Sequence, residues 1–84
     1  MKNNKKLYKQ QTQNAKYHFD QGIIHLRDSN FIEAENEFKK GISADPLSLA
    51  LIINLGISLA KQNKTLQAEK VYKRALKLKP NSLE

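Results

Sequence analysis

The sequence repeats itself with a period of 34 residues, and this internal repeat restricts the fold more than any other feature. When the chain is laid over itself at that offset, small residues fall on small residues, aromatic on aromatic, aliphatic on aliphatic and proline on proline. The matched pairs are Gly22 with Gly56, Ala34 with Ala68, Phe38 with Tyr72, Ile42 with Leu76, and Pro46 with Pro80. A period of this length is typical of chains built from stacked copies of one supersecondary unit, in which each copy buries its apolar face against a neighbour.

Apolar residues in each copy recur at steps of three and four, which is the spacing of one face of an α-helix. No stretch shows the alternation that is typical of a strand, so the sequence predicts an all-α fold. The expected helices span 15–28, 31 to the Asp45-Pro46 pair, 47–62 and 66–78. The expected helix caps are Asn30 for the second helix, Asp45 for the third, with Pro46 at its first position, and Thr65 for the fourth.

The stretch 47–60, LSLALIINLGISLA, contains the highest concentration of apolar residues in the chain. It is shorter than the run of about 20 apolar residues that a membrane-spanning helix needs. We therefore expect no membrane span and a helix that is buried on most of its surface. The glycines at Gly41 and Gly56 would let the two helices of a hairpin cross closely. The aromatic rings of Phe38 and Tyr72 would then fill the space beside them.

A 34-residue helix-turn-helix unit with small, aromatic and proline residues at these positions resembles the tetratricopeptide repeat. The resemblance covers residues 15–82 as two units, 15–48 and 49–82. The motifs of the second unit that match the family pattern are Asn54-Leu55-Gly56, Lys61-Gln62, and Ala75-Leu76 followed by Pro80. The resemblance implies an α-solenoid of two helical hairpins, that is, four antiparallel helices with right-handed superhelical stacking.

The first unit departs from the family pattern at three positions where large apolar residues are usual. These are His18, Gln21 and His25, which stand where the second unit has Ile52, Leu55 and Leu59. Because a terminal repeat needs a polar outer face, this departure predicts that the array starts at Ala15. Residues 1–14 are polar and basic, so we expect either a disordered tail or a partial upstream extension of the first helix.

The last expected helix carries an apolar flank at positions where the second helix is polar or smaller. Val71, Ala75 and Leu78 stand there in place of Glu37, Gly41 and Ala44. We expect this flank to be covered by further repeats, by a second copy of the chain in a homodimer, or by a partner's helix. Residues 83–84 are interpreted either as the start of a third unit or as a cloning remnant.

The sequence contains no set of residues with the spacing that catalysis or metal binding requires. His18 and His25 lie seven residues apart on one helix face, but they lack cysteine or carboxylate partners at ligand spacing. The three glycines are isolated within helices, so there is no phosphate-binding loop, and no serine or threonine is paired with a base. We therefore expect a chain that is not an enzyme and that binds no metal or cofactor.

In the tetratricopeptide family, the first helices of successive repeats line a concave groove that holds a peptide or a helix of a partner protein. Carried over to this sequence, the groove residues are Lys16, Phe19, Asp20, Ile23, Leu26 and Arg27 from the first helix and Ile53, Asn54, Ile57, Ala60 and Lys61 from the third. An apolar floor with basic residues at its rim would suit an acidic peptide with an apolar anchor. The resemblance thus implies a scaffold or adaptor that binds proteins. In the alternative interpretation, the apolar members pack between the hairpins and bind nothing.

The net charge of +7 suggests a second function. Residues 1–16 carry five lysines and no acidic residue, and residues 61–79 carry seven basic residues against Glu69. Such segments could bind nucleic acid or another polyanion. The basic residues of the last helix alternate with its apolar face, however, as on any solvated amphipathic helix, so this is the weaker alternative. With no cysteine and no apolar signal-peptide region at the N-terminus, the sequence predicts a cytoplasmic protein.

Overall fold

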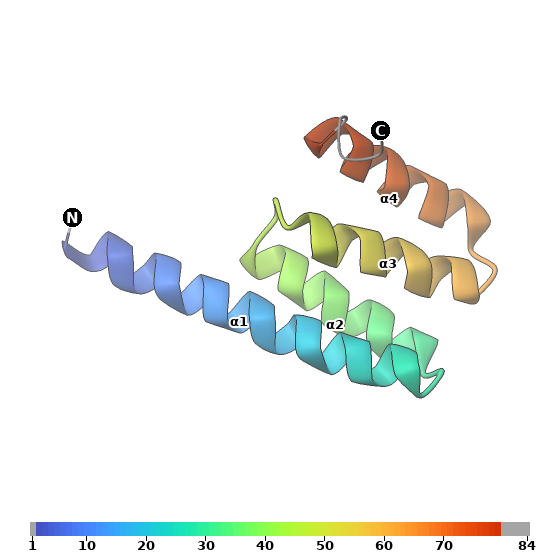
Figure 1. The fold of residues 1–84 in the computed structure, drawn as a ribbon, viewed down its shortest axis with the longest axis horizontal. Helices are drawn as coiled ribbons and strands as arrows, with labels where there is room; N and C mark the ends of the chain where they lie inside the picture. Colours follow the sequence, from blue (N-terminus) through green and yellow to red (C-terminus); the bar gives the residue numbers. More distant parts are fainter. Residues whose placement is uncertain (1, 80–84) are drawn as a thin grey trace.

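The computed structural model describes the backbone of residues 2–79 and the side chains of residues 9–79. The helices are α1 (Lys2–Arg27), α2 (Phe31–Ala44), α3 (Leu49–Lys61) and α4 (Thr65–Leu78). Each helix packs against the next one in the chain, so that two antiparallel hairpins stack side by side (Figure 1). This is the all-α solenoid that the sequence predicts. In the part of the chain that the structure describes, no helix has both the length and the apolar character of a membrane span.

Helix α1 begins much earlier than expected and runs for 26 residues. The described part of the segment that was expected as a tail, residues 2–14, is helical. The alternative, an upstream extension of the first helix, describes the structure better, and the extension is longer than anticipated. These residues include no glycine or proline and several lysines and glutamines, which are good helix formers. An established helix can therefore continue through them without tertiary support.

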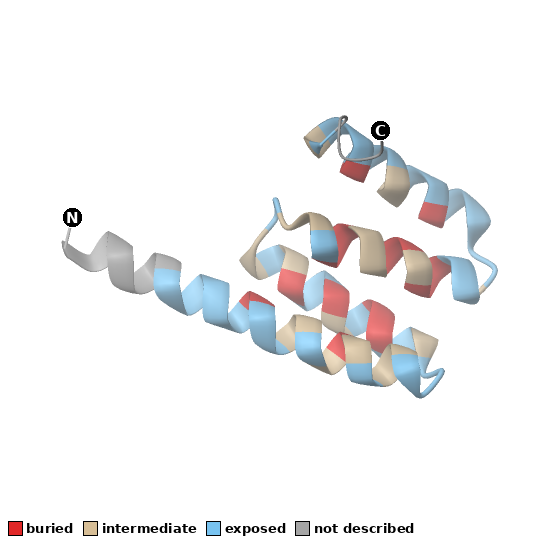
Figure 2. Ribbon diagram, viewed as in Figure 1, coloured by how far each residue is buried: buried red, intermediate tan, exposed pale blue. Residues whose placement is uncertain are grey.

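The packed part of α1 nevertheless begins where the first repeat is expected to begin. Residues 9–14 are exposed, and Ala15 is the first described residue of the helix that is buried. In Figure 2, the exposed segment projects beyond the end of α2. The repeat boundaries themselves remain predictions, and the interpretation of residues 83–84 lies outside the described residues.

The two hairpins are closed by the same turn, one period apart. Ser29 and Asn63 adopt left-handed φ values of 62° and 63°. The next residue then donates its backbone N–H to a carbonyl five residues back, at 2.8 Å from Asn30 to His25 and at 3.0 Å from Lys64 to Leu59. This is the Schellman closure of a helix C-terminus. The chain thus repeats its backbone conformation as well as its sequence pattern.

The helix caps differ from those expected. Asn30 precedes α2, but with φ −89° and ψ 73° it lies outside the extended region of a usual N-cap, and its side chain makes no cap hydrogen bond to a described residue. Thr65 is already the first residue of α4. For α3 the cap is Ser48 rather than Asp45, because the chain makes a further turn before the helix begins. The Ser48 hydroxyl accepts a hydrogen bond from the N–H of Leu51 at 3.3 Å.

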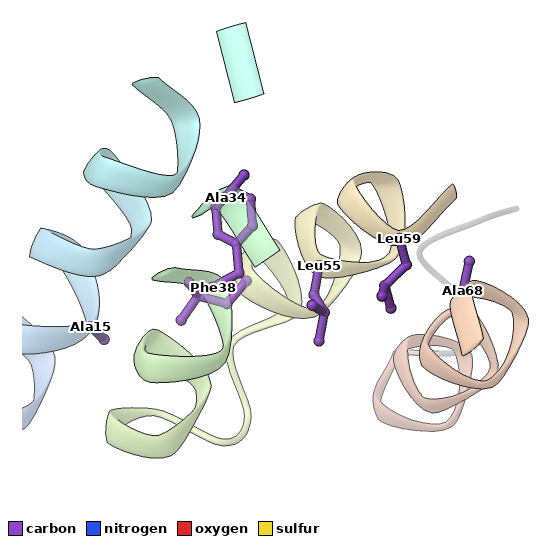
Figure 3. Packing of buried hydrophobic residues seen from close by; sticks show 7 residues of the cluster. Ala15, Ala34, Phe38, Leu55, Leu59 and Ala68 are labelled. Atoms are coloured by element: carbon purple, nitrogen blue, oxygen red, sulfur yellow. The ribbon is translucent and has the colours of Figure 1, made fainter. Parts of the chain in front are cut away.

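The apolar core runs through the four described helices (Figure 3). Its buried members are Ala15 of α1, Ala34 and Phe38 of α2, Leu51, Leu55 and Leu59 of α3, and Ala68 of α4. Phe38 is 0% exposed, and its ring lies beside Gly22 and Phe19 of α1. Helix α3 therefore occupies the buried middle position that its composition predicts.

A glycine faces an aromatic ring in both hairpins. A methyl group at Gly22 would overlap the ring of Phe38, and one at Gly56 would overlap the ring of Tyr72. The close crossing expected at Gly56 is therefore confirmed, whereas in the first hairpin the close contact lies at Gly22. Gly41 acts differently from the expectation, because a methyl group there would meet the side chain of Leu51 on α3. The small size of Gly41 thus allows close packing of α2 against α3 of the next hairpin, and not against α1.

Candidate binding surface

The apolar residues of the expected groove come from the first helix of each hairpin, α1 and α3. Phe19 and Ile23 on α1 are half-buried, and both pack against the core cluster. Ile53 and Ile57, one period later on α3, are half-buried too. Each of these side chains therefore keeps part of its surface accessible. The sequence left open whether these residues line a groove or pack inside the protein. Phe19 and Ile23 pack against the core and also keep part of their apolar surface accessible.

Charged residues flank this apolar surface. Lys16, Arg27 and Lys61 are exposed. Asp20 is exposed as well, and its Oδ2 lies 3.5 Å from Nζ of Lys16 on the next turn of α1. An ion pair between two exposed side chains contributes little to stability. The flanks therefore carry three cations and one carboxylate that a partner could meet.

The remaining expected groove residues contribute less. Leu26 is half-buried and packs against the core cluster, whereas Ala60 is exposed. Asn54 is half-buried, and its amide Nδ2 donates a hydrogen bond to the carbonyl oxygen of Ala50 at 2.8 Å. One donor of Asn54 is thus already used within α3.

A hollow of about 210 Å³ lies at one end of this surface, where α1 passes the turn between α2 and α3. Its lining residues are Thr12, Ala15, Lys16 and Phe19 of α1, Asp45 and Ser48 of the turn, and Ala50 and Leu51 of α3. The sequence indicated Lys16 and Phe19 but missed the others. The 34-residue offset could have found Ala50, which stands one period after Lys16. The two turn residues were not expected there, because the sequence predicts Asp45 as a helix cap and places Ser48 within the third helix.

The residues expected to mediate self-association are more enclosed than the sequence suggests. Ala75 is buried, and Val71 and Leu78 are half-buried. Val71 packs against the core cluster of its own chain. The large apolar side chains of α4 that are exposed are instead Leu66, at 77%, and Leu76, at 40%. Self-association through the expected flank remains a prediction.

The basic residues of α4 are partly engaged within the chain. Nζ of Lys73 lies 3.7 Å from Oε1 of Glu69, and Nη2 of Arg74 donates to the carbonyl oxygen of Pro46 at 3.0 Å. Lys70 and Lys77 are exposed. This distribution is that of a solvated helix face with local partners, and no observation on α4 favours a dedicated polyanion site.

His18 has a structural partner that the sequence did not reveal. Its Nδ1 lies 2.7 Å from Oε2 of Glu37 on α2, and both side chains are half-buried. The hydrogen bond to His18 is the main reason that the pKa of Glu37 is lowered from its ordinary value. His18 is therefore part of the packing between α1 and α2, where a polar surface cap was expected. Among the described residues, no three potential ligands gather as a metal site would require.

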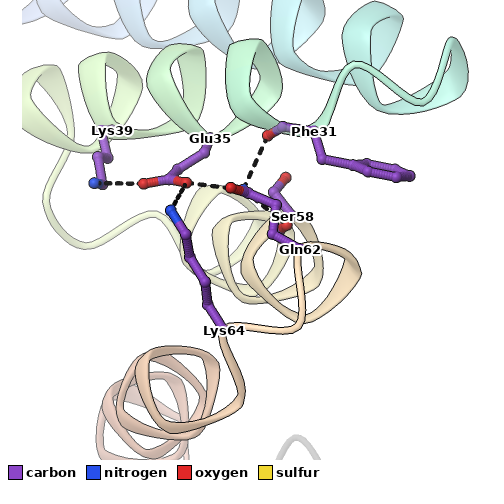
Figure 4. A network of polar contacts seen from close by, with 6 residues as sticks. All are labelled: Phe31, Glu35, Lys39, Ser58, Gln62 and Lys64. Atoms are coloured by element: carbon purple, nitrogen blue, oxygen red, sulfur yellow. Dashed lines mark hydrogen bonds and ion pairs between the residues drawn. The ribbon is translucent and has the colours of Figure 1, made fainter.

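A buried carboxylate that was not predicted from the sequence joins the two hairpins (Figure 4). The side chain of Glu35 on α2 is only 7% exposed. Its Oε2 lies 2.6 Å from Nζ of Lys39, and its Oε1 accepts hydrogen bonds from Nε2 of Gln62 at 2.8 Å and Nζ of Lys64 at 3.3 Å. Gln62 and Lys64 come from the turn between α3 and α4. The network therefore ties the first hairpin to the closing turn of the second.

Burial would raise the pKa of Glu35, since it disfavours the charged form. The hydrogen bonds from Lys39, Gln62 and Lys64 outweigh this effect, so the pKa of Glu35 lies below its ordinary value. Gln62 also reaches the carbonyl oxygens of Phe31, at 3.3 Å, and of Ser58, at 3.1 Å. A buried charge with this many partners is satisfied, and its role is structural.

Comparison with known proteins agrees with this architecture. Residues 50–82 match the family model of the tetratricopeptide repeat. A Caenorhabditis elegans protein named as a protein O-mannosyl-transferase is 34% identical over 64 residues, which make up 76% of this chain and 9% of that protein. The chain thus spans less than a tenth of the length of this relative. No solved structure matches the chain. Residues 50–82 therefore carry a tetratricopeptide repeat, and the four helices of the described residues, arranged as two hairpins with the same turn, are consistent with two such repeats.

Proposed function

We propose that this chain is a non-catalytic interaction module that binds a peptide or a helix of a partner protein along α1 and α3. Tetratricopeptide repeats generally mediate protein–protein interaction. The observation that carries the proposal is the repeated pair of half-buried apolar residues, Phe19 and Ile23 on α1 and Ile53 and Ile57 on α3. They offer accessible apolar surface on a rigid support, which is what a binding anchor requires.

The partner is proposed to be acidic and to carry an apolar side chain. Lys16, Arg27 and Lys61 are exposed beside the apolar residues, and Asp20 alone opposes them among the expected groove residues. The hollow next to Lys16 and Phe19 has room for one medium-sized side chain. A surface built from two repeats is smaller than a standard interface of about 1,600 Å², so we expect weak binding, with Kd in the micromolar range.

The transferase name belongs to a relative of which this chain covers only a small part. The proposal for this chain is therefore limited to binding, and no transferase activity is proposed. The cytoplasmic location expected from the sequence remains a prediction.

The test begins with selection of peptides from a random library on the immobilised 84-residue chain, followed by measurement of Kd by fluorescence anisotropy. Ile53→Glu and Ile57→Glu should each weaken binding of a selected peptide at least about tenfold, because a carboxylate would replace the apolar anchor site and repel an acidic ligand. Circular dichroism should show unchanged helicity.

Ile32→Glu is the matched control. It makes the same chemical change at a side chain that is 62% exposed on α2, a helix that contributes no expected groove residue. This variant should bind as the unchanged chain does. Equal loss of affinity in the control and in Ile53→Glu, or no loss in either, would show that the peptide binds elsewhere.

A further inference from the structure

The lysine positions of α1 all fall on one side of the helix. The segment 2–14 continues α1 beyond the end of α2, and residues 9–14 are exposed (Figure 2). At about 3.6 residues per turn, the lysine positions lie within about 100° of one another around the helix axis. We call these positions the lysine face; they are Lys2, Lys5, Lys6, Lys9 and Lys16.

The charges of the lysine face repel one another along the helix. The first acidic residue of the sequence is Asp20, which lies 3.5 Å from Nζ of Lys16. Further upstream, Lys2 and Lys9 each stand three or four residues from both Lys5 and Lys6. Like charges at this spacing destabilise a helix. An acidic ligand would remove this repulsion, so its binding would also stabilise the helical form of the segment.

The lysine face continues into the hollow at the end of the proposed binding surface. Lys16 belongs to both, because it lines the hollow together with Phe19. Thr12, which lies in the segment that extends beyond α2, lines the hollow as well. Lys9 precedes Lys16 by about two turns on the same side of α1. A ligand with an apolar side chain in the hollow would therefore bring the neighbouring part of its chain to the lysines.

We infer that the lysine face binds an acidic segment of the partner protein, which adjoins in sequence the apolar side chain that occupies the hollow. The inference rests on the proposed function, and it adds that the acidic residues lie at the end of the ligand that leaves the groove along residues 2–14. The lysine face covers about 21 Å along the helix axis. An extended run of about six residues has this length.

A nucleic acid fits this surface less well than an acidic peptide does. Its phosphates would complement the lysine face, but it has no aliphatic side chain for the hollow, whose lining includes Ala15, Phe19 and Leu51. The side of α1 that carries the lysine positions also contains no aromatic residue on which a base could stack. A peptide that combines an acidic run with an apolar side chain complements both the lysine face and the hollow.

The first experiment measures the lysine face with fluorescein-labelled decaglutamate, by fluorescence anisotropy of the full chain at about 50 mM salt. Lys2→Gln, Lys5→Gln and Lys9→Gln together should weaken binding at least about fivefold, because they remove cations from the face. Glutamine is a good helix former, so circular dichroism should show a folded chain. Ile53→Glu, which tests the groove, should leave decaglutamate binding within about twofold.

The matched control removes the same number of lysines from α4, so that the net charge changes by the same amount. These are the exposed residues Lys70, Lys73 and Lys77, each replaced by glutamine. This variant should bind decaglutamate within about twofold of the unchanged chain. Equal loss in the two variants, or no binding of decaglutamate by the unchanged chain, would overturn the inference. So would a short DNA duplex that binds more tightly than decaglutamate and loses affinity in the α1 variant, because the face would then bind nucleic acid.

A second experiment tests where the acidic run lies relative to the groove. The library-selected peptide is extended by a short glutamate run at its N-terminus in one probe and at its C-terminus in another. Only one extension should tighten binding, by at least about tenfold, because the lysine face lies at one end of the groove. The α1 variant should remove this gain. Equal affinity of the two extended peptides would overturn the inference and leave the groove intact, whereas selected-peptide binding that survives Ile53→Glu would contradict the groove.

Discussion

At the residue scale, the contact between a glycine and an aromatic ring in each hairpin gives a prediction with an unusual sign. Glycine to alanine within a helix normally adds up to about 1 kcal/mol of stability. At Gly22 the new methyl group would overlap the ring of Phe38, which is fully buried and cannot move aside. Gly22→Ala should therefore destabilise the chain by about 1–3 kcal/mol, measured by urea unfolding.

Gly56→Ala provides the internal comparison. The overlap there is with the ring of Tyr72, which is only half-buried and can shift toward solvent. Its cost should be smaller than that of Gly22→Ala. An increase in stability on Gly22→Ala would contradict this account. It would show that the packing of α1 against α2 leaves room for a methyl group at residue 22.

The carboxylates of Glu35 and Glu37 predict a loss of stability in acid. Burial opposes the charged form of Glu35, but hydrogen bonds from Lys39, Gln62 and Lys64 prevail, so its pKa is lowered in the folded chain. The pKa of Glu37 is lowered chiefly by its hydrogen bond to His18. A lowered pKa contributes stability that is present above the ordinary value of 4.5 and is lost as pH falls through the folded value.

The measurement is Tm as a function of pH between about 6 and 3. The unchanged chain should lose Tm below about pH 4.5, and Glu35→Gln should lose less over the same interval because residue 35 no longer takes up a proton. Glu33→Gln, at an exposed position of α2, is the control and should follow the unchanged chain. Parallel curves for Glu35→Gln and the unchanged chain would contradict the stabilising role of the charge.

At the scale of the helical element, the two hairpins have different residue types at equivalent positions, a polar pair in the first hairpin and an apolar pair in the second. The pair formed by His18 and Glu37 in the first hairpin stands one period before Ile52 and Val71 in the second. His18→Ile alone should destabilise the chain by about 1–3 kcal/mol, because it removes the 2.7 Å hydrogen bond of the Glu37 carboxylate and leaves that carboxylate with the 3.7 Å ion pair to Lys40.

The double change His18→Ile with Glu37→Val should recover most of that loss or exceed the stability of the unchanged chain, since apolar pairs often replace buried polar pairs without cost. A double-mutant cycle from urea unfolding measures the recovery. Additive losses would show that His18 and Glu37 do not stabilise each other.

The element boundaries show what the sequence could predict. Apolar spacing and the 34-residue offset located α2, α3 and α4 to within about two residues, because their amphipathic pattern is strong. The start of α1 was missed, since a polar segment that packs against nothing has no apolar period to detect. The Glu35 network was missed for another reason. Gln62 and Lys64 are 27 and 29 residues away along the chain, and only the stacking of the hairpins brings them to the carboxylate.

At the scale of the whole molecule, the predicted groove residues come from α1 and α3, and two of them line the hollow between α1 and the turn before α3. Lys16 and Phe19 line the hollow, whereas Ile53 and Ile57 are half-buried residues of α3 outside it. The hollow was not predictable, because it depends on the extra turn between α2 and α3 and on the position of Ser48 as the cap. The shape of the hollow depends on the conformation of the turn between α2 and α3. The spacing of apolar residues along the sequence does not predict that conformation.

The central claim is that partners bind on the surface of α1 and α3, and amide chemical shifts of the uniformly labelled chain test it most directly. On titration with a library-selected acidic peptide, we expect the largest shift changes at residues 16–27 and 50–61, with saturation in the micromolar range. Changes confined to α2 and α4 would contradict the account and place the binding surface on the opposite helices of the hairpins.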